Sequence, residues 1–268
     1  MNSKYIGNYI LRNVNGVCVA QSPILSQFNE LVHYITTRKI LSTTNNELDE
    51  LNMSVSNEDF PRYFDFFAKC INISPDKCVF SHQTHSKNVK VVTREDIGEP
   101  YWNRKLKEVD GLITNDKELF LVTTYADCMP IVAYDPMKRV VGVAHSGWRG
   151  TLLEIGKELV LKMNEAFGCN PEELFVTVGP SIGPESFEVG PDVAAEFFMK
   201  FGNEVLLKIN GDEKIHIDLW KAVEITLKSV GVVHLEFSNI DTYKHTEYFY
   251  SYRREKTKKR FAVIVGIV

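Results

Sequence analysis

The stretch 121–151, LVTTYADCMPIVAYDPMKRVVGVAHSGWRGT, constrains the fold of this chain more than any other part. It contains two short apolar runs, and each leads into a side chain that can act as a nucleophile or as a soft-metal ligand. Cys128 follows the first run and His145 ends the second. A Gly-Trp-Arg-Gly turn comes next, and apolar residues then recur at helical spacing over 152–167. We therefore expect strands whose ends present reactive groups, followed by a long helix that Gly168 terminates.

The rest of the chain alternates between β-rich and helical patterns. Aromatic and β-branched residues with intervening turn signals predict strands across 4–36, and the polar segment TTNNELDELN separates them from a first helix. That helix is expected at about 57–70, opened by a capping box at 56–59, with Phe60, Phe64, Phe67 and Ile71 on one face. Further helices are expected at 191–201, opened by Pro191, and at 218–230, capped by Asp218. Strands outnumber helices and many are consecutive, which predicts an α+β fold. We expect a single domain, residues 1–268, with mixed β-sheets packed as a sandwich and flanked by helices.

Composition argues against several classes of protein. The net charge of −4 gives no electrostatic footprint for nucleic acid or a membrane surface. Five cysteines, widely spaced and without a CxxC pair, argue against a disulfide framework and a zinc ribbon. The N-terminus lacks a signal-peptide pattern, and no stretch approaches the roughly 18 apolar residues of a membrane span. We therefore expect a cytoplasmic protein without nucleic-acid or membrane partners, in which the basic run EKTKKR forms a solvated hairpin loop.

Three side chains near predicted strand ends could share a metal ion. His85 lies in the polar loop SHQTHSKN, Cys128 lies in a polar break between strands, and His145 ends a strand. A mononuclear catalytic zinc takes three protein ligands and keeps one position open, and two histidines with one cysteine are an allowed set. The pattern alone leaves the question open. A single cysteine is commonly a small buried hydrophobic residue, and a single histidine at a strand end commonly makes a surface hydrogen bond.

Six motifs occur in order along the chain: QTHSKNV, VDGLITN, ADCMPIVAYDP, VGVAHSGWRGT, VGPSIGPESFEVG and FYSYRR…RFAVIVGIV. From about residue 30 onward the chain resembles the purine nucleoside phosphorylase family that was formerly described as laccase-domain or multicopper polyphenol oxidase proteins. The resemblance implies a zinc site formed by His85, Cys128 and His145. It also implies a purine nucleoside and phosphate as partners, with phosphorolysis of adenosine, inosine and S-methyl-5′-thioadenosine. Adenosine deamination is implied as a second activity.

The chemistry that the resemblance implies suggests roles for residues near the ligands. Deamination needs an activated water and a proton shuttle beside the metal. Asp127, adjacent to Cys128, is the first candidate for the shuttle, and Glu188 is the second, although either carboxylate could instead be solvated or turn-forming. We count Cys128 with them as a catalytic residue. Arg149 and Gly150, at a predicted helix N-terminus, offer phosphate a guanidinium, backbone N–H groups and a favourable dipole. Arg149 could equally make a structural ion pair.

The N-terminal part of the chain departs from the family pattern. Arg38 in ITTRK resembles the arginine of a T-R-x-G-G segment and is expected to bind substrate, but the glycines that usually follow are absent. The Asn-Arg pair common in the family's first helix is also missing around 57–71. These departures concern one wall of the substrate pocket and leave the three proposed ligands unaffected. His82, close to His85, is kept outside the ligand set.

Three other functions compete with the phosphorylase. Two histidines and a cysteine resemble a blue-copper site, and Met129 adjoins Cys128. The chain has seven histidines, too few for a blue-copper centre plus a trinuclear cluster, so zinc is favoured over copper and a copper-dependent polyphenol oxidase is the weaker hypothesis. A metal-free hydrolase could use Cys128 as nucleophile and His145 as base. An interaction module with an unused site is the third alternative. The sequence leaves the oligomeric state open.

Overall fold

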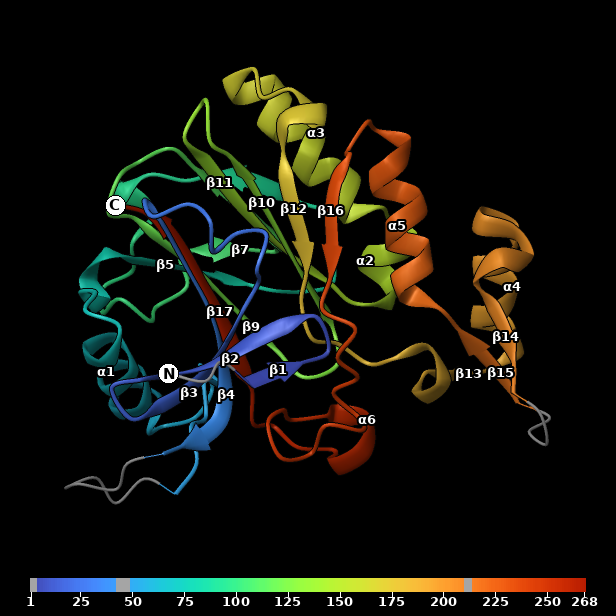
Figure 1. The fold of residues 1–268 in the computed structure, drawn as a ribbon, viewed down its shortest axis with the longest axis horizontal. Helices are drawn as coiled ribbons and strands as arrows, with labels where there is room; N and C mark the ends of the chain where they lie inside the picture. Colours follow the sequence, from blue (N-terminus) through green and yellow to red (C-terminus); the bar gives the residue numbers. More distant parts are fainter. Residues whose placement is uncertain (1–3, 42–48, 210–213) are drawn as a thin grey trace.

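The computed structural model of the protein describes residues 4–41, 49–209 and 214–268. Two large β-sheets pack face to face, and helices cover their outer surfaces (Figure 1). The predicted α+β fold, with mixed sheets in a sandwich flanked by helices, is therefore confirmed. The polar segment TTNNELDELN lies largely outside the described residues.

The C-terminal strand lies in the middle of the first sheet, between β4 and β9, and pairs antiparallel with both. In contrast, β5 runs parallel to β9, so the sheet is mixed. In spatial order its strands are β1 (Lys4–Ile6), β2 (Tyr9–Val14), β3 (Val17–Gln21), β4 (Leu31–Ile40), β17 (Phe261–Ile267), β9 (Phe120–Tyr125), β5 (Cys78–His82) and β7 (Leu106–Lys107).

The second sheet contains two strands of the stretch 121–151, whose first apolar run is instead β9 of the first sheet. Its central pair, β10 and β11, is antiparallel and buried at every residue. In spatial order its strands are β16 (His234–Phe237), β12 (Phe175–Val178), β10 (Met129–Asp135), β11 (Val140–Ser146), β8 (Gly111–Thr114) and β6 (Val89–Val91). A small third sheet contains β13 (Glu188–Val189), β15 (Ile215–Ile217) and β14 (Leu206–Lys208).

Alternating side chains of the first sheet divide between two cores. Leu121 of β9 and Val263 of β17 face the second sheet, whereas their neighbours Val122 and Ile264 face α1 (Phe60–Cys70). This division follows from the two-residue period of a β-strand, in which successive side chains point to opposite faces. The central strands of the sheet are therefore apolar on both sides.

The first helix, α1, buries the phenylalanines that its sequence pattern placed on one face. The capping box predicted at 56–59 is wrong. The helix begins at Phe60, its N-cap is Asp59, and no side chain caps it. The Ser56 hydroxyl instead shares a hydrogen bond of 3.1 Å with the Ser54 hydroxyl, in the segment before the helix begins.

The long helix predicted after the Gly-Trp-Arg-Gly turn is two helices. Glu154 adopts a left-handed conformation with φ of 58°, and this interrupts the helical hydrogen bonding. Gly168 ends the second helix with φ of 67°, as predicted. The helices after α1 are α2 (Trp148–Leu152), α3 (Ile155–Phe167), α4 (Pro191–Phe201), α5 (Leu219–Ser229) and α6 (Tyr252–Glu255).

Helices α3 and α5 lie along the outer face of the second sheet, and α4 stands to one side with the third sheet (Figure 1). Asp218 caps α5 through a hydrogen bond from the N–H of Lys221, and α4 begins at its proline, both as predicted. Within the described ranges, no helix is long and apolar enough to cross a membrane.

Candidate metal centre

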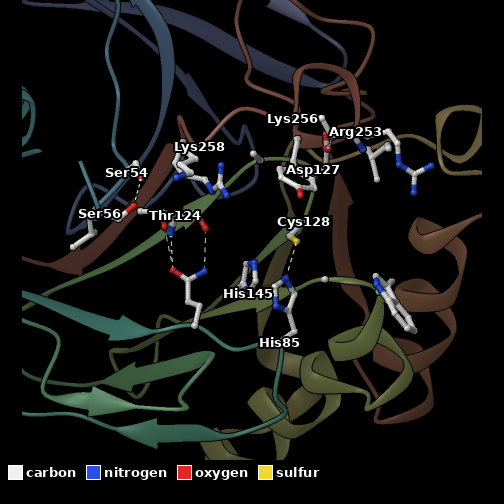
Figure 2. A pocket seen from close by; sticks show the side chains of 18 of the residues that line it. Ser54, Ser56, His85, Thr124, Asp127, Cys128, His145, Arg253, Lys256 and Lys258 are labelled. Carbon is white, nitrogen blue, oxygen red and sulfur yellow. Dashed lines mark hydrogen bonds between the residues drawn. The ribbon is translucent and has the colours of Figure 1, made fainter. Parts of the chain in front are cut away.

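His85, Cys128 and His145 meet at the end of the second sheet where β10 begins and β11 ends (Figure 2). One potential ligand atom from each residue lies within 4.8 Å of the other two. Cys128 Sγ is 3.7 Å from His85 Nε2. Cys128 lies beside His145 because the antiparallel register of β10 and β11 pairs Pro130 with His145. The structure thus brings together the three residues that the sequence proposed as ligands.

The buried carboxylate of Asp110 organises both histidines. His145 Nδ1 lies 2.9 Å from Asp110 Oδ1 and donates a hydrogen bond to it. The same carboxylate accepts hydrogen bonds from the backbone N–H groups of Thr84, His85 and Ser86. These bonds hold His85 at a φ of 63°, a left-handed conformation that residues other than glycine rarely adopt. Because Nδ1 of His145 faces Asp110, its Nε2 is left to face the cluster.

The electrostatics of the cluster favour a thiolate. Burial raises the pKa of Cys128, but the neighbouring His145 and His85 outweigh this effect and lower it to about 6. Burial likewise lowers the pKa of His145, but Cys128 and Asp110 outweigh this and raise it to about 9. The pKa of Asp110 stays well below its usual range, despite its burial, because His145 and Ser86 donate to it. A thiolate is the form of cysteine that binds metals.

Gly147 allows the backbone after His145 to approach the cluster closely. A Cβ atom on Gly147 would lie 2.4 Å from His85 Cδ2 and 3.1 Å from Cys128 Sγ, so any side chain there would displace a proposed ligand. Two imidazole nitrogens and one thiolate form a donor set that suits zinc, and three ligands leave a fourth position open. The donor set and its spacing therefore fit a zinc ion.

A cavity of about 620 Å³ opens in front of the cluster and is lined by all three of its residues. Asp127 is the one carboxylate among the described lining residues. Five cationic side chains also line it: Arg104, Arg253, Lys256, Lys258 and Arg260. The cavity is thus strongly cationic in a chain whose net charge is −4.

The basic segment near the C-terminus contributes three of these cations. The predicted hairpin is wrong, because the segment joins a helix to a strand, whereas the predicted solvation is confirmed by the exposed side chains of Lys256 and Lys258. The segment joins α6 to β17 and faces the cavity. The register of the first sheet explains this position, because Phe261 at the start of β17 pairs with Tyr125 at the end of β9. The residues before β17 therefore emerge beside those after β9, where Asp127 and Cys128 lie. Sequence spacing alone carried no signal for this pairing.

Of the two predicted catalytic carboxylates, Asp127 lines the cavity and Glu188 does not. Asp127 accepts hydrogen bonds from Thr242 Oγ1 at 2.8 Å and from the N–H of Arg253 at 2.6 Å. Its φ of 83° is left-handed, a conformation that costs free energy and is often found at functional sites. The Glu188 carboxylate instead pairs with Lys214 Nζ at 2.6 Å.

The structure does not bring the predicted substrate-binding residues Arg149, Gly150 and Arg38 to the cavity. Arg149 is exposed, and its guanidinium lies 4.2 Å from the ring centre of Trp148. Successive helix residues are rotated by roughly 100°, so Trp148 lines the cavity while Arg149 lies outside the lining. Gly150 is buried within α2. Arg38 pairs with Glu50 at 2.6 Å.

Comparison with known proteins decides the family. Residues 32–268 match the family model described as multi-copper polyphenol oxidoreductase laccase. The chain belongs to this family. One relative, the purine nucleoside phosphorylase YlmD of Bacillus subtilis (strain 168), is 32% identical over 213 residues, which cover 78% of this chain and 77% of that protein. A purine nucleoside phosphorylase of Bacteroides thetaiotaomicron is 31% identical over 240 residues, 86% of this chain and 88% of that protein.

Solved structures of other proteins share the fold. YfiH of Bacillus licheniformis, described as a hypothetical protein, has a TM-score of 0.84 at 25% identity, covering 96% of this chain and 99% of that one. YlmD from Geobacillus stearothermophilus has a TM-score of 0.84 at 24% identity, covering 96% and 97%. The predicted membership in a family of purine nucleoside phosphorylases formerly described as laccase-like is thus confirmed, and the relatives' names support an enzymatic role.

Proposed function

We propose that the protein is a zinc-dependent purine nucleoside phosphorylase that acts on adenosine, inosine and S-methyl-5′-thioadenosine, with adenosine deamination as a second activity. The observation that supports this most is the cluster of His85, Cys128 and His145, which faces a cavity in a chain whose relatives are named purine nucleoside phosphorylases. The cavity of about 620 Å³ falls within the range of small-molecule sites. The five cysteines are free, which supports a reducing, cytoplasmic setting.

Asp127 is proposed to move the protons in both reactions. Zinc held by the three side chains would supply a Lewis acid that activates water for attack at C6 of adenine. As the water oxygen bonds to C6 and the C6–N1 double bond opens, Asp127 would carry one proton from the water to N1. It would then carry the remaining hydroxyl proton to the amine, so that the C6–N bond breaks, C6 becomes a carbonyl and ammonia departs. In phosphorolysis the bond from C1′ to the purine breaks and an oxygen of dihydrogen phosphate bonds to C1′, while Asp127 would carry a proton from the phosphate to the departing purine. The donors Thr242 and Arg253 fix the orientation of its carboxylate.

A product assay with matched histidine variants tests the proposal. Zinc-loaded protein is incubated with adenosine, inosine or S-methyl-5′-thioadenosine, with and without phosphate, and free bases, inosine, ammonia and ribose 1-phosphates are measured. We expect base release that needs phosphate, and ammonia release from adenosine that does not. His85→Ala should abolish both activities. His82→Ala should retain them, because His82 lies at the end of β5 outside the cavity lining. Zinc-bound protein that converts no purine nucleoside would refute the proposal.

The same assay separates the two competing chemistries. The ligand atoms of Cys128 and His145 lie within 4.8 Å of each other, an arrangement that also suits the thiol hydrolase with His145 as base. A hydrolase would remain active after complete chelation and lose activity on alkylation of Cys128, whereas the proposed enzyme requires the metal. A copper polyphenol oxidase would be purified with stoichiometric copper, absorb intensely in the visible range and oxidise phenols.

A further inference from the structure

The cationic lining of the cavity is the feature that the proposed reaction leaves unassigned. The five cations occupy two places. Arg253 and Lys256 belong to α6 and the residue that follows it, near Asp127, and their side chains are engaged by the protein. Arg253 Nη1 donates to the Glu188 carbonyl at 2.7 Å, and Lys256 Nζ lies 5.3 Å from the ring centre of Tyr252. These two cationic side chains therefore already have partners within the protein and need no ligand to satisfy them.

Arg104 and Lys258 differ from that pair. Across the residues that the structure describes, no oxygen accepts a hydrogen bond or an ion pair from either side chain. Arg104 is partly buried, and this burial lowers the pKa of its guanidinium. A partly buried guanidinium without an anion is unfavourable, because the protein has removed part of its hydration and returned no partner. These two cations are therefore available to an anionic ligand.

Two hydroxyl groups lie on the same side of the cavity. Ser54 and Ser56 both line it, and their oxygens are 3.1 Å apart. Backbone hydrogen bonds tie this segment to Arg260, because Met53 N–H donates to the Arg260 carbonyl at 2.8 Å and Asn52 Oδ1 accepts from the Arg260 N–H at 3.1 Å. Figure 2 shows Ser54, Ser56 and Lys258 together at one side of the cavity, away from the proposed zinc ligands.

The segment that carries Arg104 contacts α1, the helix that follows the two serines. Tyr101 packs against Phe64 of α1 and donates a hydrogen bond to Asp65 at 2.6 Å. Ser54 and Ser56 precede α1 directly in the sequence. The cavity thus gathers side chains from three separate segments. Arg260 lines it as well, and its Nη1 donates to the carbonyls of Thr257 at 3.0 Å and Lys259 at 2.8 Å. No described residue accepts a hydrogen bond from its Nη2, which leaves that nitrogen available to a ligand.

We propose that Ser54, Ser56, Arg104, Lys258 and Arg260 form the binding site for inorganic phosphate, the second substrate of the proposed phosphorolysis. This inference rests on the proposed function. Guanidinium, ammonium and hydroxyl donors are the groups that bind phosphate oxygens most strongly. The site replaces the one expected at the Gly-Trp-Arg-Gly turn, where Arg149 lies outside the cavity lining.

The experiment measures phosphate binding directly, so that it does not depend on turnover. Inorganic phosphate is titrated calorimetrically into zinc-loaded protein, and the phosphate KM and nucleoside KM are measured where turnover occurs. Arg104→Ala and Lys258→Ala should each weaken phosphate binding at least about tenfold, the effect of losing one charged hydrogen bond. The nucleoside KM of these two variants should change by less than about twofold. Arg104→Lys should restore part of the affinity, because it keeps the charge but loses the bidentate geometry.

Two neighbouring lysines are matched controls, each losing one positive charge in the same segment. Lys105 donates to the Glu95 carbonyl at 3.2 Å, and Lys259 pairs with Glu50 at 3.0 Å; neither lines the cavity. Lys105→Ala and Lys259→Ala should bind phosphate as the unaltered protein does. The inference is overturned if folded Lys258→Ala and Arg104→Ala retain the phosphate affinity of the unaltered protein, or if the two control variants weaken phosphate binding as much as they do. Phosphate binding without any nucleoside turnover would refute the proposed function and leave this site supported.

Discussion

His145 Nδ1 lies 2.9 Å from Asp110 Oδ1, and both side chains are buried. The same carboxylate accepts the backbone N–H of His85 at 3.0 Å. One acidic side chain therefore sets the ring orientation of one proposed zinc ligand and the backbone conformation of another. Carboxylates that accept the second ring N–H of a metal-binding histidine commonly fix its tautomer and raise its basicity.

Replacement of Asp110 should weaken zinc binding. Asp110→Asn keeps the size of the side chain but removes the charge and replaces one acceptor oxygen with a donor. We expect the zinc affinity to fall by roughly 10- to 100-fold, the usual effect of losing such a partner. Competition with a chromophoric chelator measures this affinity, and Asp59→Asn, an exposed residue with no side-chain capping bond, is the control. An unchanged affinity in folded Asp110→Asn would contradict the assigned role.

A methyl group at Gly147 should displace the proposed ligands. In Gly147→Ala the new Cβ would meet His85 Cδ2 at 2.4 Å, so His85 or the backbone must move. Gly150→Ala is a matched change in the same turn, since the nearest atoms to its Cβ would lie 3.5 Å away, an ordinary contact. We expect dialysed Gly147→Ala to lose most of its zinc while Gly150→Ala retains it. Elemental analysis with circular dichroism tests this, and equal zinc contents would show the prediction to be wrong.

Removal of zinc should expose a reactive thiolate. The pKa of Cys128, lowered to about 6 in the metal-free protein, keeps the thiolate populated at pH 7, where an ordinary thiol with a pKa near 8.5 is mostly protonated. We expect iodoacetamide to modify Cys128 rapidly after chelation, with a rate that falls as the pH drops through about 6. Zinc should protect it. Peptide mass spectrometry measures the rate, and buried Cys78, whose pKa is raised by burial, is an internal control. A midpoint near 8.5 would argue against the thiolate.

His33 should make the protein less stable in acid. This histidine is buried in β4 with Nε2 3.3 Å from the Ser22 carbonyl, and burial lowers its pKa from 6.5 to about 4. As the pH falls below 6.5, the unfolded chain binds the proton first, so the free energy of unfolding decreases until the pH reaches about 4. The shift corresponds to a loss of up to about 3 kcal/mol.

His33→Gln removes this titration while the other groups of the protein remain. Urea unfolding at several pH values should therefore show a shallower decrease in the variant than in the unaltered protein between pH 6.5 and about 4. The difference between the two curves isolates His33, because every other titrating group is common to both. Parallel curves would mean that His33 is protonated as easily in the folded state as in the unfolded chain.

Local patterns determined much of the fold. The spacing of phenylalanines predicted the buried face of α1, and Gly168 predicted the end of α3, because side-chain periodicity and left-handed caps are properties of neighbouring residues. The start of α1 and the break at Glu154 escaped prediction. Both depend on the contacts that a few residues make with the surrounding chain, and helix propensity alone does not predict them.

The sequence by itself determined the three proposed ligands, because His85, Cys128 and His145 belong to short motifs that can be recognised without a structure. Only the tertiary structure decided what surrounds them. Asp110 lies in the motif VDGLITN, but its contacts with both histidines arise from strand pairing. The cations of the cavity come from segments that meet because β17 pairs with β9, with Phe261 opposite Tyr125 although the two are 136 positions apart in the sequence. Such long-range contacts form because the whole sheet is buried, and no local sequence pattern predicts them.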